Sequence, residues 1–193
     1  PGSEDKRAYS LANTSNWDGR LEFLIRLQPN GKFSNFLNQQ AQPGMELMVR
    51  GPQGAFGVNE GSLRPRWFVA GGTGLAPMLA MLRRMAENQD MQEARLFFGV
   101  NRESELCMQD ELARLQSELL QFKVDLCVWQ PQGDWSGLTG TPADALRAAL
   151  ADAETQPDIY LCGPPALLDA AEKVAAEFGV PKDQVFSERF LAA

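Results

Sequence analysis

The sequence predicts an α/β protein in which a five-stranded, doubly wound parallel sheet follows a shorter all-β segment. Three observations favour this fold. The chain changes at about residue 66 from short strand-like stretches to alternating strand-like and helix-like stretches. After that point, compact apolar runs recur at intervals of about 30 residues. A helix-like segment separates each run from the next, which is typical of a parallel sheet with helices on both faces.

The first half of the chain is expected to form short strands and turns. Strands are predicted at residues 7–11, 20–27, 45–50 and 55–58, and a short helix at residues 35–39. Gly44 closes the loop after the helix, and a turn at residues 51–54 joins the last two strands. Three or four short strands form only part of a barrel or sandwich, because a free edge and an unburied face would remain. We therefore expect a preceding segment or a partner to complete this sheet.

The second half is expected to alternate strands and helices. Strands are predicted at residues 67–70, 95–100, 122–129, 158–162 and 184–186. Helices are predicted at residues 76–87, 109–119, 142–150 and 165–178. Thr141 followed by Pro142 predicts the start of the third of these helices, and Gly179 the end of the fourth. The boundary falls within residues 60–65, which gives two domains, residues 1–62 and 63–193.

Composition excludes several classes of function. The formal net charge is −7, so the phosphates of nucleic acid would repel the chain as a whole. The absence of histidine excludes Ser-His-Asp triads, Cys-His dyads and most catalytic zinc sites. Cys107, Cys127 and Cys162 are too widely spaced for a disulfide framework or a metal-ligand run. We therefore expect no metal site in this chain and a reducing, cytoplasmic compartment.

No association with a membrane is expected. The longest uncharged stretch, residues 67–82, contains three glycines and a proline and is too short to span a bilayer. Charged residues at positions 4–7 lead directly into a strand-like segment, so no signal peptide is expected.

A glycine-rich bend at residues 70–77 is the first candidate site. It follows the first predicted strand of the parallel sheet and precedes a helix, where ligands of open α/β sheets bind. Glycines allow a sharp turn and close approach of a ligand, and free N–H groups at a helix start suit a pyrophosphate. Pro77 fits the first helical turn. The alternative is a tight turn that only packs the helix on the strand.

Three weaker motifs are candidates of the same kind. Residues 162–165 (CGPP) follow the fourth strand of the parallel sheet, which should neighbour the first. Arg7 and Tyr9 share one face of a strand, with a fork for phosphate and a flat ring face. Residues 31–34 precede a helix start. The alternatives are a buried core cysteine, an ordinary surface pair and a simple helix cap.

These motifs together resemble the ferredoxin–NADP reductase superfamily. The motifs appear in the order Arg7-x-Tyr9-Ser10, Gly31-x-x-Ser34-x-x-Leu37, GGTGLAP at 71–77, Cys162-Gly163-Pro164 and Glu188-x-Phe190. Order and spacing match over nearly the whole chain. Within the superfamily, the stretches GRLEFLIR, LFFGVN, CVWQPQGDW and PDIYLCGPP are most similar to the reductase components of soluble methane monooxygenase and related bacterial multicomponent monooxygenases.

The resemblance implies a nicotinamide-binding α/β domain at residues 63–193, preceded by the carboxy-terminal part of an antiparallel β-barrel FAD domain at residues 1–62. It implies that these residues hold FAD: Arg7, Tyr9, Ser10, Gly31, Lys32, Phe33, Ser34 and Phe190. It implies that these residues hold NADH: Gly71, Gly72, Thr73, Gly74, Pro77, Asn101, Glu103, Cys162, Gly163 and Pro164. It implies catalytic roles for Ser10, Cys162 and Glu188 beside the reacting rings.

The implied reaction is hydride transfer from NADH to FAD, followed by release of single electrons. The acceptors would be a ferredoxin module carrying a 2Fe-2S centre and an oxygenase or hydroxylase component. The alternative is a non-catalytic flavin- or nucleotide-binding subunit for electron transfer or regulation, and a third reading is a structural fragment without cofactor.

This chain departs from the superfamily pattern in three places. The superfamily has further barrel strands before Arg7, and the monooxygenase reductases have a ferredoxin module before the barrel, and neither is found in this sequence. Cys107 and Met108 stand where such relatives often have two aromatic residues. The choice of NADH over NADPH depends on residues 101–105, which carry both a carboxylate and an arginine and are alternatively a solvated loop.

Overall fold

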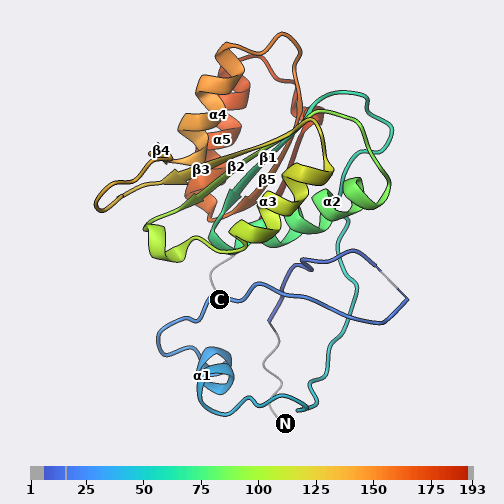
Figure 1. Cartoon of the computed structure of the whole chain (residues 1–193), viewed down its shortest axis with the longest axis vertical. Coiled ribbons are helices and arrows are strands. Elements are labelled where there is room, and N and C mark those ends of the chain that lie inside the picture. Colours follow the sequence, from blue (N-terminus) through green and yellow to red (C-terminus); the bar gives the residue numbers. More distant parts are fainter. Residues whose placement is uncertain (1–6, 16, 191–193) are drawn as a thin grey trace.

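The second half of the chain forms a six-stranded parallel sheet. The computed structural model describes residues 7–15 and 17–190. The strand order is β4-β3-β2-β1-β5-β6. The strands are β1 (Arg66–Gly71), β2 (Ala94–Val100), β3 (Phe122–Val128), β4 (Leu138–Thr139), β5 (Asp158–Gly163) and β6 (Val185–Arg189). After β4 the chain returns past β1 to form β5, so the strand order reverses between β1 and β5 (Figure 1).

Four helices cover the two faces of this sheet (Figure 1). They are α2 (Leu75–Glu87) and α3 (Gln109–Glu118) on one face, and α4 (Pro142–Ala151) and α5 (Pro165–Glu177) on the other. Residues of β1 alternate between the two layers, as the twofold period of a strand requires. Phe68 and Ala70 belong to the core with α2 and α3, and Trp67 and Val69 to the core with α4 and α5. Burial on both faces explains the continuous apolar run of this strand.

The helix starts follow local chemistry that the sequence predicts. Thr141 caps α4 in a capping box: its Oγ1 accepts from the Asp144 N–H at 3.3 Å, and Asp144 Oδ2 accepts from the Thr141 N–H at 2.8 Å. The side-chain hydrogen bond from Thr141 is the main cause of the lowered pKa of Asp144. Pro142 occupies the first helical position, where its missing N–H costs nothing.

The predicted alternation of strands and helices in the second half is confirmed. All five predicted strands are present, with ends shifted by at most three residues, and so are the four helices. The prediction of five strands missed β4, which pairs with β3 through Cys127–Leu138 and Val128–Thr139. Two exposed residues carry no periodic pattern, so a strand of this length leaves no sequence signal.

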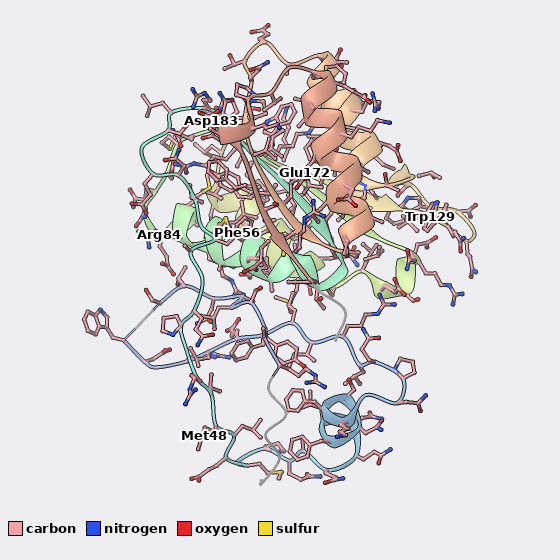
Figure 2. The ribbon with its side chains drawn as sticks, turned by 180° about the vertical axis from the view of Figure 1, so that it is seen from behind. Met48, Phe56, Arg84, Trp129, Glu172 and Asp183 are labelled. Carbon is pink, nitrogen blue, oxygen red and sulfur yellow. The ribbon has the colours of Figure 1, made fainter. Side chains whose placement is uncertain are left out.

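The first half of the chain is extended rather than regularly paired. Among the described residues before β1, the helix α1 (Lys32–Gln39) is confirmed and starts three residues earlier than predicted. The four predicted strands are wrong as regular strands: the ladder there consists of one antiparallel bridge, Leu11–Phe23. Side chains such as Met48 stay exposed, because the extended segments have no neighbouring strand to cover them. Figure 2 shows Met48 far from the sheet and Phe56 beside it.

Two further findings concern the described residues. No helix in this part of the chain is both long and apolar enough to cross a membrane. Across the same residues, no three His, Cys, Asp or Glu side chains gather in a way that could hold a metal ion.

Candidate functional site

The glycine-rich bend lies where the strand order reverses. Strand β1 ends at Gly71, a single 3-10 turn (Gly72–Gly74) follows, and α2 begins at Leu75. Ala70 is the register partner of Cys162 on β5, so the ends of the two strands are adjacent. The two sequence motifs, predicted separately, therefore form one corner at the carboxyl edge of the sheet.

Two glycines of the bend are required by packing. A Cβ on Gly74 would lie 2.1 Å from the carbonyl oxygen of Cys162, and a Cβ on Gly71 would lie 2.7 Å from Cδ2 of Leu167. A Cβ on Gly163 would lie 3.0 Å from the backbone nitrogen of Gly71. Each of these three positions therefore has a packing reason for glycine.

Gly72 has no such packing role. Its φ is +54°, which favours glycine, and no atom lies within 4 Å of the position of its missing Cβ. Thr73 beside it is half-buried. Pro77 lies buried in the first turn of α2, as predicted. Space above Gly72 and the amino end of α2 leaves the bend open to an anion.

Three residues with predicted catalytic roles converge next to this corner. Ser10 Oγ donates a hydrogen bond to Glu188 Oε2 at 2.6 Å, across 178 residues of sequence. Cys162 Sγ lies 4.0 Å from the same oxygen. Cys162 and Glu188 are register partners on β5 and β6, so their side chains project from the same face of the sheet. The extended segment around Ser10 is thereby fastened to the carboxyl edge of the sheet.

The Cys162 thiol is neutral in this environment. Its side chain is fully buried, and burial raises its pKa well above the ordinary value, with the charge of Glu188 adding to the effect. A thiol of this kind is not a thiolate nucleophile. It offers an uncharged, polarisable surface and a weak donor.

Tyr9 belongs to a group of aromatic rings in the first half of the chain. Its ring lies 6.4 Å from that of Phe23 and 5.8 Å from that of Phe33, centre to centre. It remains 37% exposed, and partial burial raises its pKa, against the opposing charge of Arg7. Arg7 itself is exposed. One flat aromatic surface is therefore available beside Ser10.

The segment at residues 31–34 forms the start of α1. Gly31 is the N-cap residue, and a Cβ added to it would lie 3.1 Å from Ser34 Oγ. The Ser34 hydroxyl is buried and accepts the Gln28 N–H at 2.9 Å, so it closes the loop before the helix. Lys32 is exposed. The segment reaches Tyr9 through Phe33, while α1 itself lies away from the sheet (Figure 1).

The loop after β2 lies beside the bend, because β2 neighbours β1. The Asn101 N–H donates to Glu105 Oε2 at 3.1 Å. Glu103 Oε1 accepts the Gln132 N–H at 2.9 Å, and Glu103 Oε2 takes no part in that hydrogen bond. On the opposite side of the corner, the Phe190 N–H donates to the Gly163 carbonyl at 3.3 Å. Pro164 is exposed at the start of α5.

Sequence reasoning singled out neither Trp129 at this edge nor Arg83 further along α2. Trp129, labelled in Figure 2, follows β3, and its side chain is 59% exposed. Its backbone N–H donates to the Val100 carbonyl at 3.1 Å. An aromatic residue at the carboxyl end of a predicted strand is a signal that could have drawn attention to it. Arg83 on α2 contacts Ala12 and Glu22, which lie 71 and 61 positions earlier in the sequence. No local sequence pattern distinguishes it from other helical arginines.

Family models match both parts of the chain. The Oxidoreductase NAD-binding domain matches residues 68–173, which is more than half of the chain and includes the bend and the Cys162 corner. The Oxidoreductase FAD-binding domain matches residues 1–57, the segment that carries Tyr9 and Ser10.

Curated relatives match most of this chain. The anthranilate 1,2-dioxygenase electron transfer component of Acinetobacter baylyi is 36% identical over 191 residues, covering 99% of this chain and 55% of the relative. Methane monooxygenase component C of Methylosinus trichosporium is 43% identical over 150 residues, covering 78% of this chain and 44% of the relative. The chain thus spans about half the length of these relatives.

A solved structure with a similar fold is the Amycolatopsis cytochrome P450 reductase GcoB. It superposes with a TM-score of 0.83 at 27% identity, over 98% of this chain and 58% of that one. The superfamily predicted from five short motifs is therefore confirmed. The chain belongs to the ferredoxin reductase family of oxidoreductases, which combine an FAD-binding and an NAD-binding domain.

Proposed function

We propose that this chain is the flavin- and NADH-binding part of a reductase that supplies electrons to a multicomponent oxygenase. The observation that supports this most is the convergence of Ser10, Cys162 and Glu188 from both halves of the chain beside the glycine-rich bend. Relatives named as electron transfer and monooxygenase components support the same role.

Under this proposal, residues 1–62 form the FAD-binding part and residues 63–193 the NADH-binding part. The fit is supported by two features of the chain. The partly exposed Tyr9 ring, packed on Phe33, offers a flat surface for a flavin ring. Gly72, with open space above it at the amino end of α2, suits the pyrophosphate of a dinucleotide.

The proposed roles of the remaining residues follow from their positions. Arg7, Lys32 and the first-turn N–H groups at residues 32–34 would bind the flavin pyrophosphate, with Phe190 beside the flavin ring. Asn101 and Glu103, at the end of β2, would bind the ribose of NADH through the free oxygen of Glu103. Gly71 and Gly74 would act through packing rather than contact.

Bound FAD supplies the redox chemistry, because it accepts a hydride from NADH and releases electrons singly. The chain positions the rings and excludes water from between them. Ser10 Oγ, held by Glu188 at 2.6 Å, presents a fixed hydroxyl at the edge of the site. The neutral Cys162 thiol allows an apolar ring to approach without an opposing charge.

The acceptor under this proposal is an oxygenase or hydroxylase component, reached through a 2Fe-2S ferredoxin module. The similarity to methane monooxygenase component C favours a methane-type hydroxylase. We propose a cytoplasmic location, in keeping with the free thiols of Cys107, Cys127 and Cys162.

The test is NADH oxidation by the FAD-reconstituted chain with ferricyanide as acceptor. Ser10→Ala and Glu188→Gln are each expected to lower the rate about tenfold or more, because a small displacement of reacting groups is costly. Ser187→Ala is the matched control, since Ser187 lies next to Glu188 on β6 and is exposed. Its rate is expected to equal that of the unchanged chain.

Two results would contradict the proposal. Bound flavin without NADH oxidation would favour a non-catalytic subunit. Equal losses in the Ser187 and Glu188 variants would remove the special role of the Ser10–Glu188 contact.

A further inference from the structure

Arg83 forms a three-way contact between the two halves of the chain. Its Nη1 donates to the carbonyl of Ala12 at 2.9 Å and to Glu22 Oε2 at 2.7 Å. Its Nε donates to Glu111 Oε1 on α3 at 2.7 Å. The side chain is only 16% exposed. Burial acts to lower the pKa of Arg83, but the hydrogen bonds that it donates to Glu111 and Glu22 outweigh this and raise the pKa above its ordinary value.

The contact holds both segments of the one antiparallel bridge seen in the described first half. Ala12 and Glu22 flank the Leu11–Phe23 bridge, and the Ala12 N–H donates to the Glu22 carbonyl at 2.8 Å. Arg83 binds the Ala12 carbonyl and the Glu22 side chain together. It therefore fixes this paired unit against α2.

The same unit carries the residues of the proposed site. Ser10 lies two positions before Ala12 and is bound to Glu188 on β6. The segment from Ser10 to Ala12 is thus fastened at both ends to the second half of the chain, by β6 at one end and by α2 at the other.

Helix α2 links Arg83 rigidly to the glycine-rich bend. Arg83 lies eight residues after Leu75, where the helix begins, which corresponds to about 12 Å along its axis. A change in how α2 sits against Ala12 therefore changes the separation between the bend and the Tyr9–Ser10 segment. Neighbouring Arg84 also pairs across the junction, with Glu60, but both of those side chains are more than half exposed (56% and 67%) and water weakens their attraction.

We propose that Arg83 is a positioning residue that sets the distance between the Tyr9–Ser10 segment and the nucleotide-binding edge of the sheet. The inference rests on the proposed function for its kinetic consequence, but its structural consequence is independent of any activity. Arg83 does not touch the bend, so its loss should alter transfer between the two cofactors and leave nucleotide binding unchanged.

The test compares Arg83→Met with Arg114→Met. Arg114 also donates to Glu111, and its further hydrogen bond among the described side chains goes to Glu118 on the same helix. Three quantities are measured for each variant: amide hydrogen exchange of Ala12, the dissociation constant of ADP-ribose, and the rate of flavin reduction by saturating NADH. Thermal unfolding monitors whether each variant folds.

For Arg83→Met, we expect faster exchange at Ala12, ADP-ribose binding within twofold of the unchanged chain, and flavin reduction slower by about tenfold or more. Arg114→Met should change none of these more than about twofold. Arg83→Lys keeps the charge but cannot reach all three acceptors at once, so intermediate exchange and an intermediate rate are expected.

Unchanged exchange at Ala12 in Arg83→Met and Arg83→Lys would overturn the proposal, as would equal effects of Arg114→Met. Weakened ADP-ribose binding in parallel with the rate would also overturn it, because the effect would then be on nucleotide binding. A wild-type chain that binds flavin and does not oxidise NADH would contradict the proposed function, while the exchange data would still decide the role of Arg83.

Discussion

The two halves of the molecule hold their shape in different ways. In the second half of the chain, from β1 onward (the sheet domain), every residue of β1 and β5 is buried. One apolar core lies on each face of the sheet. Among the described residues before Leu63, only Ala12, Ser34 and Ser62 are buried. The first half is held instead by a few partly buried apolar side chains, such as Phe56, and by individual polar contacts, such as those of Ser10 with Glu188 and of Asn59 with Tyr160. A substitution in the packed core should therefore lower the free energy of unfolding but leave the strands in place. A substitution in one of the polar contacts should instead change where an extended segment lies.

The largest expected effect tests the packed core. Phe68→Ala removes a fully buried ring that stacks on Tyr160 at 5.2 Å, and should lower the free energy of unfolding by about 4 kcal/mol. Leu47→Ala in the first half truncates a side chain that is 55% exposed, and should change the free energy of unfolding by less than about 0.5 kcal/mol. Urea denaturation followed by circular dichroism measures both. Similar losses in the two variants would contradict the difference between the halves.

The bend offers a second test, through glycines. Gly74→Ala would place a methyl group 2.1 Å from the Cys162 carbonyl, against rigid backbone, and should cost about 2–3 kcal/mol of stability. Gly57→Ala meets no atom within 4 Å and serves as the control, with an expected change within about 0.5 kcal/mol. If Gly74→Ala left the stability measured by chemical denaturation unchanged, the β1–β5 corner would be loosely packed, against this account.

Acid should weaken the hydrogen bonds that Arg83 and Arg114 donate to Glu111. The hydrogen bond from Arg114, and then that from Arg83, lowers the pKa of Glu111 from 4.5 to about 2. Because the folded-state pKa is depressed, the ionised form stabilises the fold above about pH 4.5, and this contribution is lost as the pH falls towards 2. The stability difference between the unchanged chain and Glu111→Gln should therefore be about 1–2 kcal/mol at pH 6 and decline below pH 4.5. A difference that does not vary between pH 6 and pH 2.5 would contradict this account.

The smallest expected effect concerns a helix start on the sheet domain. Thr141→Ala removes the hydroxyl that caps α4 and should cost about 1 kcal/mol. The loss should be seen in the midpoint of unfolding, with unchanged hydrogen exchange in residues 7–15. Altered exchange in that segment would indicate that α4 supports the first half, against the present description.

The sequence predicts the sheet domain well because its signals are local. A strand such as β1, buried on both faces, reads as a continuous apolar run, and Thr141-Pro142 marks a helix start by itself. The strands predicted in the first half were wrong because partial alternation, as at residues 20–27, indicates an extended chain and says nothing of a partner strand. The convergence of Ser10, Cys162 and Glu188 followed from the family resemblance rather than from any local pattern. Arg83 could not be predicted, because its acceptors meet only in the folded chain.

Titration with NAD+, followed residue by residue through amide chemical shifts, tests the central claim most directly. The account predicts the largest shifts at Gly72, Thr73 and Gly163, smaller shifts at Asn101, and none at Gly179, which follows the far end of α5. Saturation without any change at Gly72 and Thr73, or with changes confined to residues outside the β1–β5 corner, would contradict it.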